Sequence, residues 1–584
     1  MYPCMRCWVC RTFDGTWEAW LMEPAFSMLG ERALLVTLSR EVSVEANDLV
    51  LRLSRAVEDA RIPGIDEAQP AYSSLCVHFD PARVRASYVQ GFIRQLMQGE
   101  DGGENPETRT KVSAGVAGAG AAEKGAKLPG RDAHQVEIPV VYGGDDGPDL
   151  EWAAQYLGIS QEELIRKHTA RPYRVFMIGF TPGFPYLGEM DGSIALPRFS
   201  RPRARVPAGS VGIGGNQTGV YPWETPGGWR ILGRTAVELF SPYRDDPSLL
   251  HPGDTVRFVP VTRGGEAGAG TSGASGAFPA PAGADSAHTV LSLAVEYPGF
   301  MTMVVDEGRR RYRKLGVPVS GAADLRSYRF ANQLCGNAPG EAALEMTLLG
   351  ARLRAQVDLT VAVTGAPAPV TIDGKQASMD ESLFLPRGSL VEVGSLQSGC
   401  RTYLAVAGGI KVPRVMRSRS TYLRGRFGGY QGRLLKPGDL LPVGPAPEHS
   451  LILEQTVALP RQTPDLLAAL KAPEMVLRVT PGPEAEPSVL EALCSDSYTV
   501  SPESDRMGLR FAGRAIADAN GDILSSPVVP GTIQVPSDGR PLLLFCDAQT
   551  TGGYRRVAIV TAEDLPLAGQ LRPGARVAFW VVER

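Results

Sequence analysis

Arginines gather between residues 198 and 205, next to a segment rich in aromatic side chains. Planar donors suited to a carboxylate or a phosphate are supplied by Arg198, Arg201, Arg203 and Arg205. The aromatics that could wall a cavity are Phe180, Phe184, Tyr186, Tyr221, Trp223 and Trp229. Because pockets are mostly apolar with a few convergent polar groups, this composition is compatible with anion binding. An equally open interpretation is a small β-barrel with an aromatic core and solvated arginines.

Two further polar groups occur in the second half of the chain. The shorter one contains Asp306, Arg309, Ser320 and Asp324. The longer one contains Ser418, Arg419, Ser420, Thr421, Arg433, Asp505, Arg506, Gln534, Asp547, Thr550, Thr551 and Tyr554. Gly552 and Gly553 could present backbone N–H groups to an anion. The alternative is turn chemistry, because Asp, Ser, Thr and Gly often satisfy the backbone groups of loops.

Motifs of the familiar catalytic sites do not occur in this sequence. There is no G-x-x-x-x-G-K-[ST] loop, H-E-x-x-H helix, G-x-S-x-G elbow or Met-Lys-Met biotin site. Chemistry would therefore depend on arginine, carboxylate and amide groups displayed by loops. In the first group these are Arg198, Arg201 and Arg203, with Gln217, Tyr221 and Trp229 close by in sequence.

The totals describe an ordinary globular protein. A chain of 584 residues is too long for one hydrophobic core and predicts three or four domains. A net charge of −3 argues against nucleic acid or an anionic membrane as the main partner. No apolar run approaches the roughly 20 residues that span a bilayer, and the N-terminus lacks the apolar core of a secretory signal. These features predict a cytoplasmic protein.

Eight cysteines fall into two classes. Cys4, Cys7 and Cys10 have a spacing that iron–sulfur or zinc sites use, but no fourth ligand follows nearby. We therefore expect no metal site there, and an over-long gene start explains residues 1–22 better. The other five sit among apolar residues and are expected to be reduced core thiols: Cys76, Cys335, Cys400, Cys494 and Cys546.

Apolar spacing predicts the elements that must position these groups. A strand over residues 33–38 and helices over 42–60 and 84–97 form a small α+β unit, with His78 in a structural role on a strand. Two segments rich in Gly, Ala and small polar residues are expected to be flexible linkers. The predicted divisions are 1–22, 23–101, 102–133 (linker), 134–262, 263–289 (linker), 290–475 and 476–584.

Helix signals surround His168. Asp149 is expected to cap a helix over residues 150–157. Ser160 and Glu163 form a capping box for a second helix that ends near His168. A histidine at a helix C-terminus interacts well with the helix dipole, which is one of two open interpretations of this residue.

Residues 206–261 have an internal echo near the C-terminus. VPAGSV, TPGGWRILGRT and LLHPGDTVRFVPV are mirrored by VPSDGRP, TTGGYRRVAIVTAEDL and QLRPGARVAFWVV. A Pro-Gly turn between β-branched runs is typical of hairpins. The echo predicts a mainly β fold with α+β parts and two or three related β-barrel units.

Specific stretches resemble two known families. GFTPGFPYLG, LPRFSRPRARVPAGSV and NQTGVYPWETPGGWRILGRT resemble the KipI family, the 5-oxoprolinase B subunit or allophanate hydrolase subunit 1. From Leu291 onward, SRSTYLRGRFGGYQGRLLKPGDLL and DAQTTGGYRRVAIVTAEDL resemble the KipA family, the 5-oxoprolinase C subunit or allophanate hydrolase subunit 2. The chain differs from the second pattern at Val305, Glu307 and Ala548. The resemblance implies a fusion of the B and C subunits with cyclophilin-like barrels.

The resemblance also implies a reaction and its participants. It implies ATP-dependent opening of 5-oxoproline to glutamate with a separate LamB/YcsF-type 5-oxoprolinase A subunit, and with ATP and Mg²⁺ as participants. On this hypothesis the arginines hold phosphate or the substrate carboxylate. Asp324 or Asp547 would orient Mg²⁺ or act as a base, and His168, placed by the resemblance near the pocket mouth, would shuttle a proton. Replacing Arg203 with alanine is then expected to abolish glutamate formation and leave the fold intact.

Two alternative functions stay open. Biotin-dependent urea or amide carboxylases share both sequence families in their carboxyltransferase half. The Kip names derive from binding a sensor histidine kinase, so a regulator is the third interpretation. Self-association into a homo-oligomer is open in each case.

Overall fold

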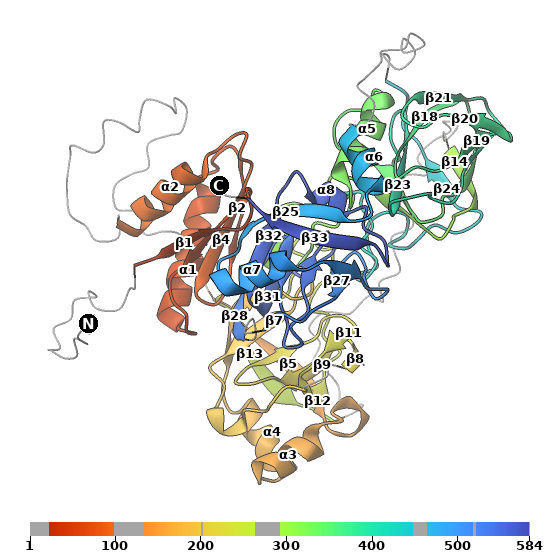
Figure 1. Cartoon of the computed structure of the whole chain (residues 1–584). Helices are drawn as coiled ribbons and strands as arrows, with labels where there is room; N and C mark the ends of the chain where they lie inside the picture. Colours follow the sequence, from red (N-terminus) through yellow and green to blue (C-terminus); the bar gives the residue numbers. More distant parts are fainter. Residues whose placement is uncertain are drawn as a thin grey trace, which may run out of the picture.

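Four folded units follow one another along the chain. The computed structural model describes residues 23–98, 133–199, 203–262, 292–447, 464–517 and 521–582. The units are a small α+β unit, a closed β-barrel, a two-sheet unit and a second closed β-barrel. Figure 1 shows the second barrel, in blue, between the N-terminal unit in red and the two-sheet unit in green. The mainly β fold with barrel units is confirmed, and the number of barrels is two.

The N-terminal unit is an antiparallel sheet with strand order β1-β2-β4-β3. Its strands are β1 (Ala25–Met28), β2 (Ala33–Thr37), β3 (Ile65–Pro70) and β4 (Ser74–Phe79), and its helices are α1 (Val44–Asp59) and α2 (Ala86–Gln98). Ser43 caps α1 by accepting a hydrogen bond from Ala46 N. One sheet face packs on the helices. The other face presents Leu35 and Cys76 to Ile559 of the second barrel.

Barrel 1 closes through a parallel pairing of its first and last strands, in which Val136 faces Val256. Its strand order is β5-β12-β9-β10-β7-β6-β13. The strands are β5 (Gln135–Tyr142), β6 (Tyr173–Ile178), β7 (Pro185–Gly188), β9 (Ser210–Ile213), β10 (Thr218–Val220), β12 (Arg230–Arg234) and β13 (Thr255–Pro260). A side ribbon pairs β8 (Arg203–Val206) with β11 (Thr225–Gly227), and α3 (Leu150–Leu157) and α4 (Gln161–Thr169) connect β5 to β6.

Barrel 2 repeats this arrangement strand for strand, with the order β25-β32-β29-β30-β27-β26-β33. Its first and last strands are again parallel, and a side ribbon again pairs β28 with β31. The strands are β25 (Met475–Pro481), β26 (Tyr498–Val500), β27 (Gly508–Ala512), β28 (Asp522–Pro527), β29 (Thr532–Gln534), β30 (Leu542–Leu544), β31 (Thr551–Tyr554), β32 (Arg556–Val560) and β33 (Arg576–Val581). The helices of this region are α6 (Pro464–Lys471), α7 (Pro487–Ser495) and α8 (Leu565–Ala568). Two of the three echoed pairs fall on equivalent strands, β11–β12 with β31–β32 and β13 with β33. The third does not, because VPAGSV joins β8 to β9 and VPSDGRP joins β29 to β30.

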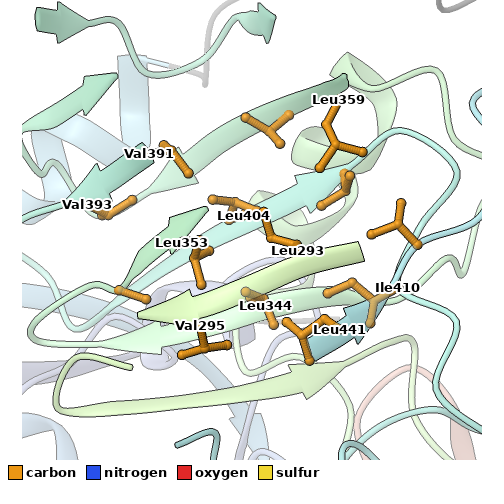
Figure 2. Packing of buried hydrophobic residues seen from close by; sticks show 14 of the residues in the cluster. Leu293, Val295, Leu344, Leu353, Leu359, Val391, Val393, Leu404, Ile410 and Leu441 are labelled. Carbon is orange, nitrogen blue, oxygen red and sulfur yellow. The ribbon is translucent and has the colours of Figure 1, made fainter. Parts of the chain in front are cut away.

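The third unit is two packed sheets. One has the order β20-β19-β22-β17-β14-β24, with β14 (Ser292–Tyr297), β17 (Arg352–Ala355), β19 (Val370–Ile372), β20 (Lys375–Ala377), β22 (Leu390–Val393) and β24 (Leu440–Pro442). The other has the order β15-β16-β23-β18-β21, with β15 (Met301–Val305), β16 (Ala343–Thr347), β18 (Leu359–Gly365), β21 (Ser382–Leu385) and β23 (Arg401–Val406). Figure 2 shows the aliphatic core between them, including Leu353 and Leu404. Helix α5 (Leu325–Leu334) packs on the second sheet.

Several expectations concern residues outside the described ranges. The Cys4–Cys7–Cys10 motif, Arg201 and almost all of both expected linkers fall there. Of the described thiols, Cys76, Cys335, Cys400 and Cys546 are buried, as expected, while Cys494 is half-buried, and no disulfide joins any of these five. Within the described ranges, no helix combines the length and apolar character needed to cross a bilayer.

Candidate functional site

The two halves of the chain meet at the turn between β6 and β7. Gly183 N donates to Leu315 O of the C-terminal half at 2.9 Å. Within barrel 1, Trp223 Nε1 supports the same turn by donating to Pro182 O at 3.0 Å. Gly316, at φ 77°, lies so close to Thr181 that a Cβ there would be 2.3 Å from the Thr181 carbonyl oxygen. Glycine is required at this position for both conformation and space.

Thr551 of barrel 2 makes a second contact with the same turn. Its Oγ1 accepts a hydrogen bond from Phe180 N at 2.9 Å and lies 3.4 Å from the Tyr186 hydroxyl. A Cβ added to Gly179 would lie 2.3 Å from this Oγ1. We call the meeting place of the 179–183 turn, residues 306–320, the 415–429 loop and residues 547–551 the junction.

Arg309 is the central charged group of the junction. Its side chain is fully buried and lies over the Phe427 ring, 4.9 Å from the centroid. Nη2 donates to the Ser420 carbonyl, but Nε and Nη1 have no hydrogen-bond partner among the described residues. Burial lowers the pKa of Arg309 to about 10, and the nearby carboxylates of Asp306 and Asp547 oppose that shift. The guanidinium is thus charged at neutral pH with donors to spare.

Asp306 organises the loop that covers this arginine. Its Oδ1 accepts from Ser418 Oγ at 2.6 Å and Ser420 Oγ at 2.9 Å, and its Oδ2 accepts from Arg419 N at 2.5 Å. The two polar groups noted in the C-terminal half of the sequence are therefore brought together. Asp306 has a positioning role, because its oxygens are engaged by the protein itself.

Unusual backbone and unpaired hydroxyls accompany Arg309. Ser320 is buried at φ 51°, a left-handed conformation that a non-glycine residue adopts at some cost. Its Oγ, together with Thr181 Oγ1 and Thr550 Oγ1, lacks a hydrogen-bond partner among the described residues. Buried polar atoms are normally paired, so these hydroxyls and the Arg309 donors favour binding of a polar ligand.

A buried ion network supports the junction from behind. The Nε and Nη2 atoms of Arg506 donate hydrogen bonds to the two oxygens of Asp547, at 3.0 and 3.1 Å. Its Nη1 donates a hydrogen bond to Glu345. Glu345 also accepts from the Tyr403 hydroxyl at 2.8 Å. Asp547, predicted as a base or Mg²⁺ ligand, has both of its oxygens held by Arg506.

Asp324 has a structural position instead of the predicted catalytic one. It caps α5, where Oδ1 accepts from Ser327 N and Oδ2 accepts from Ser327 Oγ and Gln570 Nε2. Burial raises the pKa of Asp324, and these hydrogen bonds oppose the rise. The carboxylate has no exposed surface, so its predicted role as base or Mg²⁺ ligand is not supported.

His168 is likewise inside barrel 1 and away from a pocket mouth. Nδ1 lies 2.7 Å from the Tyr142 hydroxyl, Nε2 lies 2.8 Å from Thr218 Oγ1, and the ring stacks on Phe258. Burial lowers the pKa of His168 to about 3, so the ring is neutral. With both nitrogens occupied in the core, the predicted proton shuttle is corrected to a structural role.

Asp149 and Ser160 were both expected to cap a helix, and their side chains have different hydrogen-bond partners. Ser160 Oγ accepts from Glu163 N at 3.2 Å, which confirms the cap of α4, whereas the Glu163 carboxylate binds Arg166. Asp149 occupies the N-cap position of α3, as expected, but its side chain makes no capping hydrogen bond. Its carboxylate instead accepts two hydrogen bonds from Arg203 and one from Ile231 N.

The aromatics of barrel 1 form a packed cluster next to Arg198. Phe184, Tyr186, Tyr221 and Trp229 pack edge-to-face with one another and with Phe180. Trp223 instead contacts Phe240. This arrangement confirms the core interpretation for most of these rings.

Arg198 is exposed above this cluster. Its Nη2 donates to Gln217 Oε1 at 3.3 Å, and its guanidinium lies 5.9 Å from the Trp229 ring. Its charge lowers the pKa of Tyr186, against a larger rise caused by burial. Arg198, Gln217, Tyr221 and Trp229 are therefore brought together as expected, whereas Arg205 pairs with Glu224 in solvent.

The remaining predicted residues lie outside the junction or in its walls. Arg433 forms a bidentate pair with Asp439, and Asp505 pairs with Arg424. Gln534 is buried, donates to Tyr554 O and leaves its Oε1 unpaired within the described chain. Tyr554 is 38% exposed on β31. Arg419 N binds Asp306, and its Nε donates to Val412 O.

Sequence reasoning missed Tyr72 and Phe427. The buried Tyr72 ring packs on Phe176 and Tyr186, and its hydroxyl is unpaired among the described residues. Phe427 forms the face on which Arg309 rests. Phe427 lies in a Gly-flanked turn, RFGGY, whose glycines indicate a close backbone approach. Tyr72 has no such signal.

Family models match both halves of the chain. Residues 24–250 match carboxyltransferase domain, subdomain C and D, and residues 315–581 match carboxyltransferase domain, subdomain A and B. The chain is 41% identical to the 5-oxoprolinase B subunit of Bacillus subtilis over 234 residues, covering 40% of this chain and 91% of that protein. It is 35% identical to the 5-oxoprolinase C subunit of Escherichia coli over 291 residues, 49% of this chain and 90% of that protein.

Two further comparisons extend this relationship. Urea amidolyase of Saccharomyces cerevisiae is 33% identical over 306 residues, which cover 49% of this chain and 16% of the yeast protein. The crystal structure of TTHA0988 superimposes with a TM-score of 0.76 at 34% identity, covering 94% of this chain and 99% of that one. The chain therefore belongs to the carboxyltransferase-domain family, with homologues of the 5-oxoprolinase B and C subunits fused in one polypeptide.

Proposed function

We propose that this protein is the fused B and C component of an ATP-dependent 5-oxoprolinase, which opens 5-oxo-L-proline to L-glutamate together with a separate A subunit. One observation carries the proposal: the chain contains nearly full-length counterparts of both the B and the C subunits. Urea amidolyase, in contrast, shares only a small part of its length with this chain.

The chemistry gives a reason for ATP. Enzymes lower reaction barriers by about 8–23 kcal/mol, whereas one oxyanion-hole donor contributes about 3–4 kcal/mol. A five-membered lactam is resonance-stabilised and offers little ring strain. Phosphorylation of its amide oxygen forms an O–P bond, breaks the bond between the γ-phosphorus and the bridging oxygen to release ADP, and activates the ring carbon. Water then adds to that carbon, and breaking the C–N bond gives the acyl phosphate of glutamate. A second water hydrolyses this acyl phosphate to glutamate and phosphate.

Arg309 is the residue of this chain that we assign to the substrate carboxylate or the transferred phosphate. Its Nε and Nη1 are donors without a partner among the described residues, in a buried setting where a charge-assisted hydrogen bond is strong. The Ser320 and Thr550 hydroxyls supply further donors or acceptors at the junction. Tyr243, 48% exposed and close enough for Arg309 to lower its pKa against the rise caused by burial, lies on the solvent side.

Mg²⁺, when bound with ATP, neutralises phosphate charge. The two carboxylates suggested for it do not fit, because Asp324 caps a helix and Asp547 binds Arg506 through both oxygens. Among the described residues no group of three or more His, Cys, Asp or Glu could hold a metal ion.

A carboxyltransferase of a biotin-dependent urea or amide carboxylase is the second candidate. The matching family descriptions and the urea amidolyase relative favour it. That reaction requires a biotin carboxylase and a biotinylated carrier as partners. Binding to a sensor histidine kinase without turnover is the third candidate.

A reconstitution experiment separates the three. The purified chain is mixed with a 5-oxoprolinase A subunit, ATP and 5-oxoproline, and glutamate and ADP are measured. Stoichiometric formation of both, dependent on the chain, supports the proposal. Carboxylation of urea or another amide by added biotin carboxylase and carrier, with no glutamate, would support the second candidate. A kinase captured in a pull-down, with neither reaction, would support the third.

A further inference from the structure

A cavity of about 600 Å³ lies where the N-terminal unit, residues 307–333 and barrel 2 meet. It is distinct from the junction, although the two share backbone segments. Within residues 306–320, the side chains of Glu307 and Val319 line the cavity, whereas Asp306, Arg309 and Ser320 are not among its lining residues. A volume of this size is within the range of small-molecule sites.

One wall of the cavity is apolar. Leu29 and Ala33 from the N-terminal sheet pack against Ile559 of barrel 2 behind the lining, and the partly buried Val529 lies beside them. Phe330 of α5 adds an aromatic ring. Burial of such surface favours the apolar body of a ligand by about 25 cal/mol per Å².

The opposite wall is rich in arginine. Five arginines and three acidic residues line the cavity. Two more carboxylates, those of Asp80 and Glu67, pair with Arg32 and Arg313 from outside the lining. Helix α5 contributes Arg326 and Arg329, which share one helix face because they are three residues apart. Arg329 is bound by Glu307 in a bidentate pair, at 2.7 Å and 2.5 Å, so its charge is already matched.

Three of the arginines retain unused donors or charge. Arg313 is 3.4 Å from Glu67, but its buried Nε has no partner among the described residues. Arg310 reaches Asp66 and Glu307 only at 3.8 and 3.6 Å, beyond hydrogen-bond distance. Arg326 has no ion pair within the described part of the chain. A guanidinium in this state is suited to a carboxylate or phosphate oxygen.

His78 completes the polar lining without adding charge. Its Nε2 lies 3.0 Å from Gln69 Oε1. Burial and the neighbouring Arg313 both lower its pKa well below the usual value, so the ring is neutral at physiological pH.

We propose that this cavity is a second binding site, for a small organic anion that has an apolar body and one carboxylate or phosphate group. The apolar body contacts the partly exposed side chains of Phe330 and Val529, and the anionic group binds Arg310, Arg313 and Arg326. The proposal does not depend on the reaction at the junction, so it is tested with the purified chain alone.

The test uses 8-anilinonaphthalene-1-sulfonate, a fluorescent aromatic anion, titrated into the purified full chain. We expect saturable binding that weakens at least tenfold in Arg310→Gln/Arg326→Gln. The matched control is Arg257→Gln/Arg387→Gln, which removes the same charge from exposed arginines elsewhere and should leave binding within twofold. Gln333→Trp, which adds bulk on the lining face of α5, should also abolish binding.

Two further arms identify the ligand chemistry. Phenylacetate and phenyl phosphate compete for the probe, and the stronger competitor shows whether the site favours a carboxylate or a phosphate. The neutral probe N-phenyl-1-naphthylamine should bind the double-arginine variant and the wild-type chain equally. Equal binding of the anionic probe to wild-type, double-arginine and Gln333→Trp chains would overturn the proposal. Displacement of the probe by the 5-oxoprolinase A subunit but by neither small anion would overturn it as well.

Discussion

Both Nη atoms of Arg203 donate hydrogen bonds to the carboxylate of Asp149, at 2.6 and 2.7 Å. This pair joins the β8 ribbon to the start of α3. The Asp149 side chain is 7% exposed and also accepts a hydrogen bond from Ile231 N. This relationship changes what removal of Arg203 should do, because a buried carboxylate would lose its partner.

Arg203→Ala should therefore lower the free energy of unfolding. Since Arg203 is 32% exposed, we expect a loss of about 1–3 kcal/mol, below the cost of breaking a fully buried pair. Chemical denaturation measures it. Arg205→Ala, which breaks the exposed pair with Glu224, is the control and should change stability by less than about 0.5 kcal/mol. Equal effects would contradict the structural role of Arg203.

Replacement of Arg309 should damage activity in the reconstituted system. Loss of a charge-assisted hydrogen bond worth about 1.5–3 kcal/mol corresponds to a roughly 10–150-fold fall in kcat/KM for Arg309→Gln. Arg309→Lys keeps the charge but not the planar fork, so it should recover only part of the loss. The exposed neighbour Arg311→Gln serves as the control. Full activity of Arg309→Gln in a folded chain would remove this residue from the proposed site.

The protein should become less stable in acid because His168 is buried in its neutral form. Its folded pKa of about 3 lies below the unfolded value near 6.5, so the unfolded state binds a proton first. The contribution of neutral His168 to the free energy of unfolding is complete above pH 6.5. It is lost as the pH falls from 6.5 toward 3, by up to about 1.4 kcal/mol per pH unit. In His168→Gln, denaturation curves between pH 6 and 4 should show a shallower dependence on pH. An unchanged slope would contradict a neutral, buried imidazole.

Gly179→Ala should disturb the contact between the halves. The added Cβ would lie 2.3 Å from Thr551 Oγ1, and overpacking of this kind costs about 1–3 kcal/mol. Thr551→Ala removes the oxygen and should restore part of the loss in the double variant. A double-mutant cycle on the free energy of unfolding measures the coupling, and strictly additive effects would exclude a direct clash.

The barrels were predictable from the sequence because their turns are local. TPGGWRILGRT and TTGGYRRVAIVTAEDL both run from the second strand of the side ribbon, β11 or β31, into the next barrel strand, β12 or β32. Ser160 was predictable as a cap for the same reason, since its partner is three residues away.

Contacts between distant residues were not predictable. Asp149 is next to a helix in sequence, but its strongest partner, Arg203, is 54 residues away. In the sequence Asp324 looks like a catalytic acid. In the structure Gln570, which is 246 residues away, donates a hydrogen bond to one of its oxygens. The residue types of the junction could be read from the sequence. The unpaired donors of Arg309 could not, because they depend on which of the described side chains fold against the guanidinium.

The hydrogen bond from Phe180 to Thr551 spans 371 residues of one polypeptide. In relatives that make the B and C subunits as separate chains, a contact of this kind would have to form between two molecules, and its occupancy would fall on dilution. Here the two partners share a tether, which sets a fixed effective concentration and a one-to-one ratio of the two halves. Assembly of the junction should consequently be insensitive to how much of the protein a cell makes.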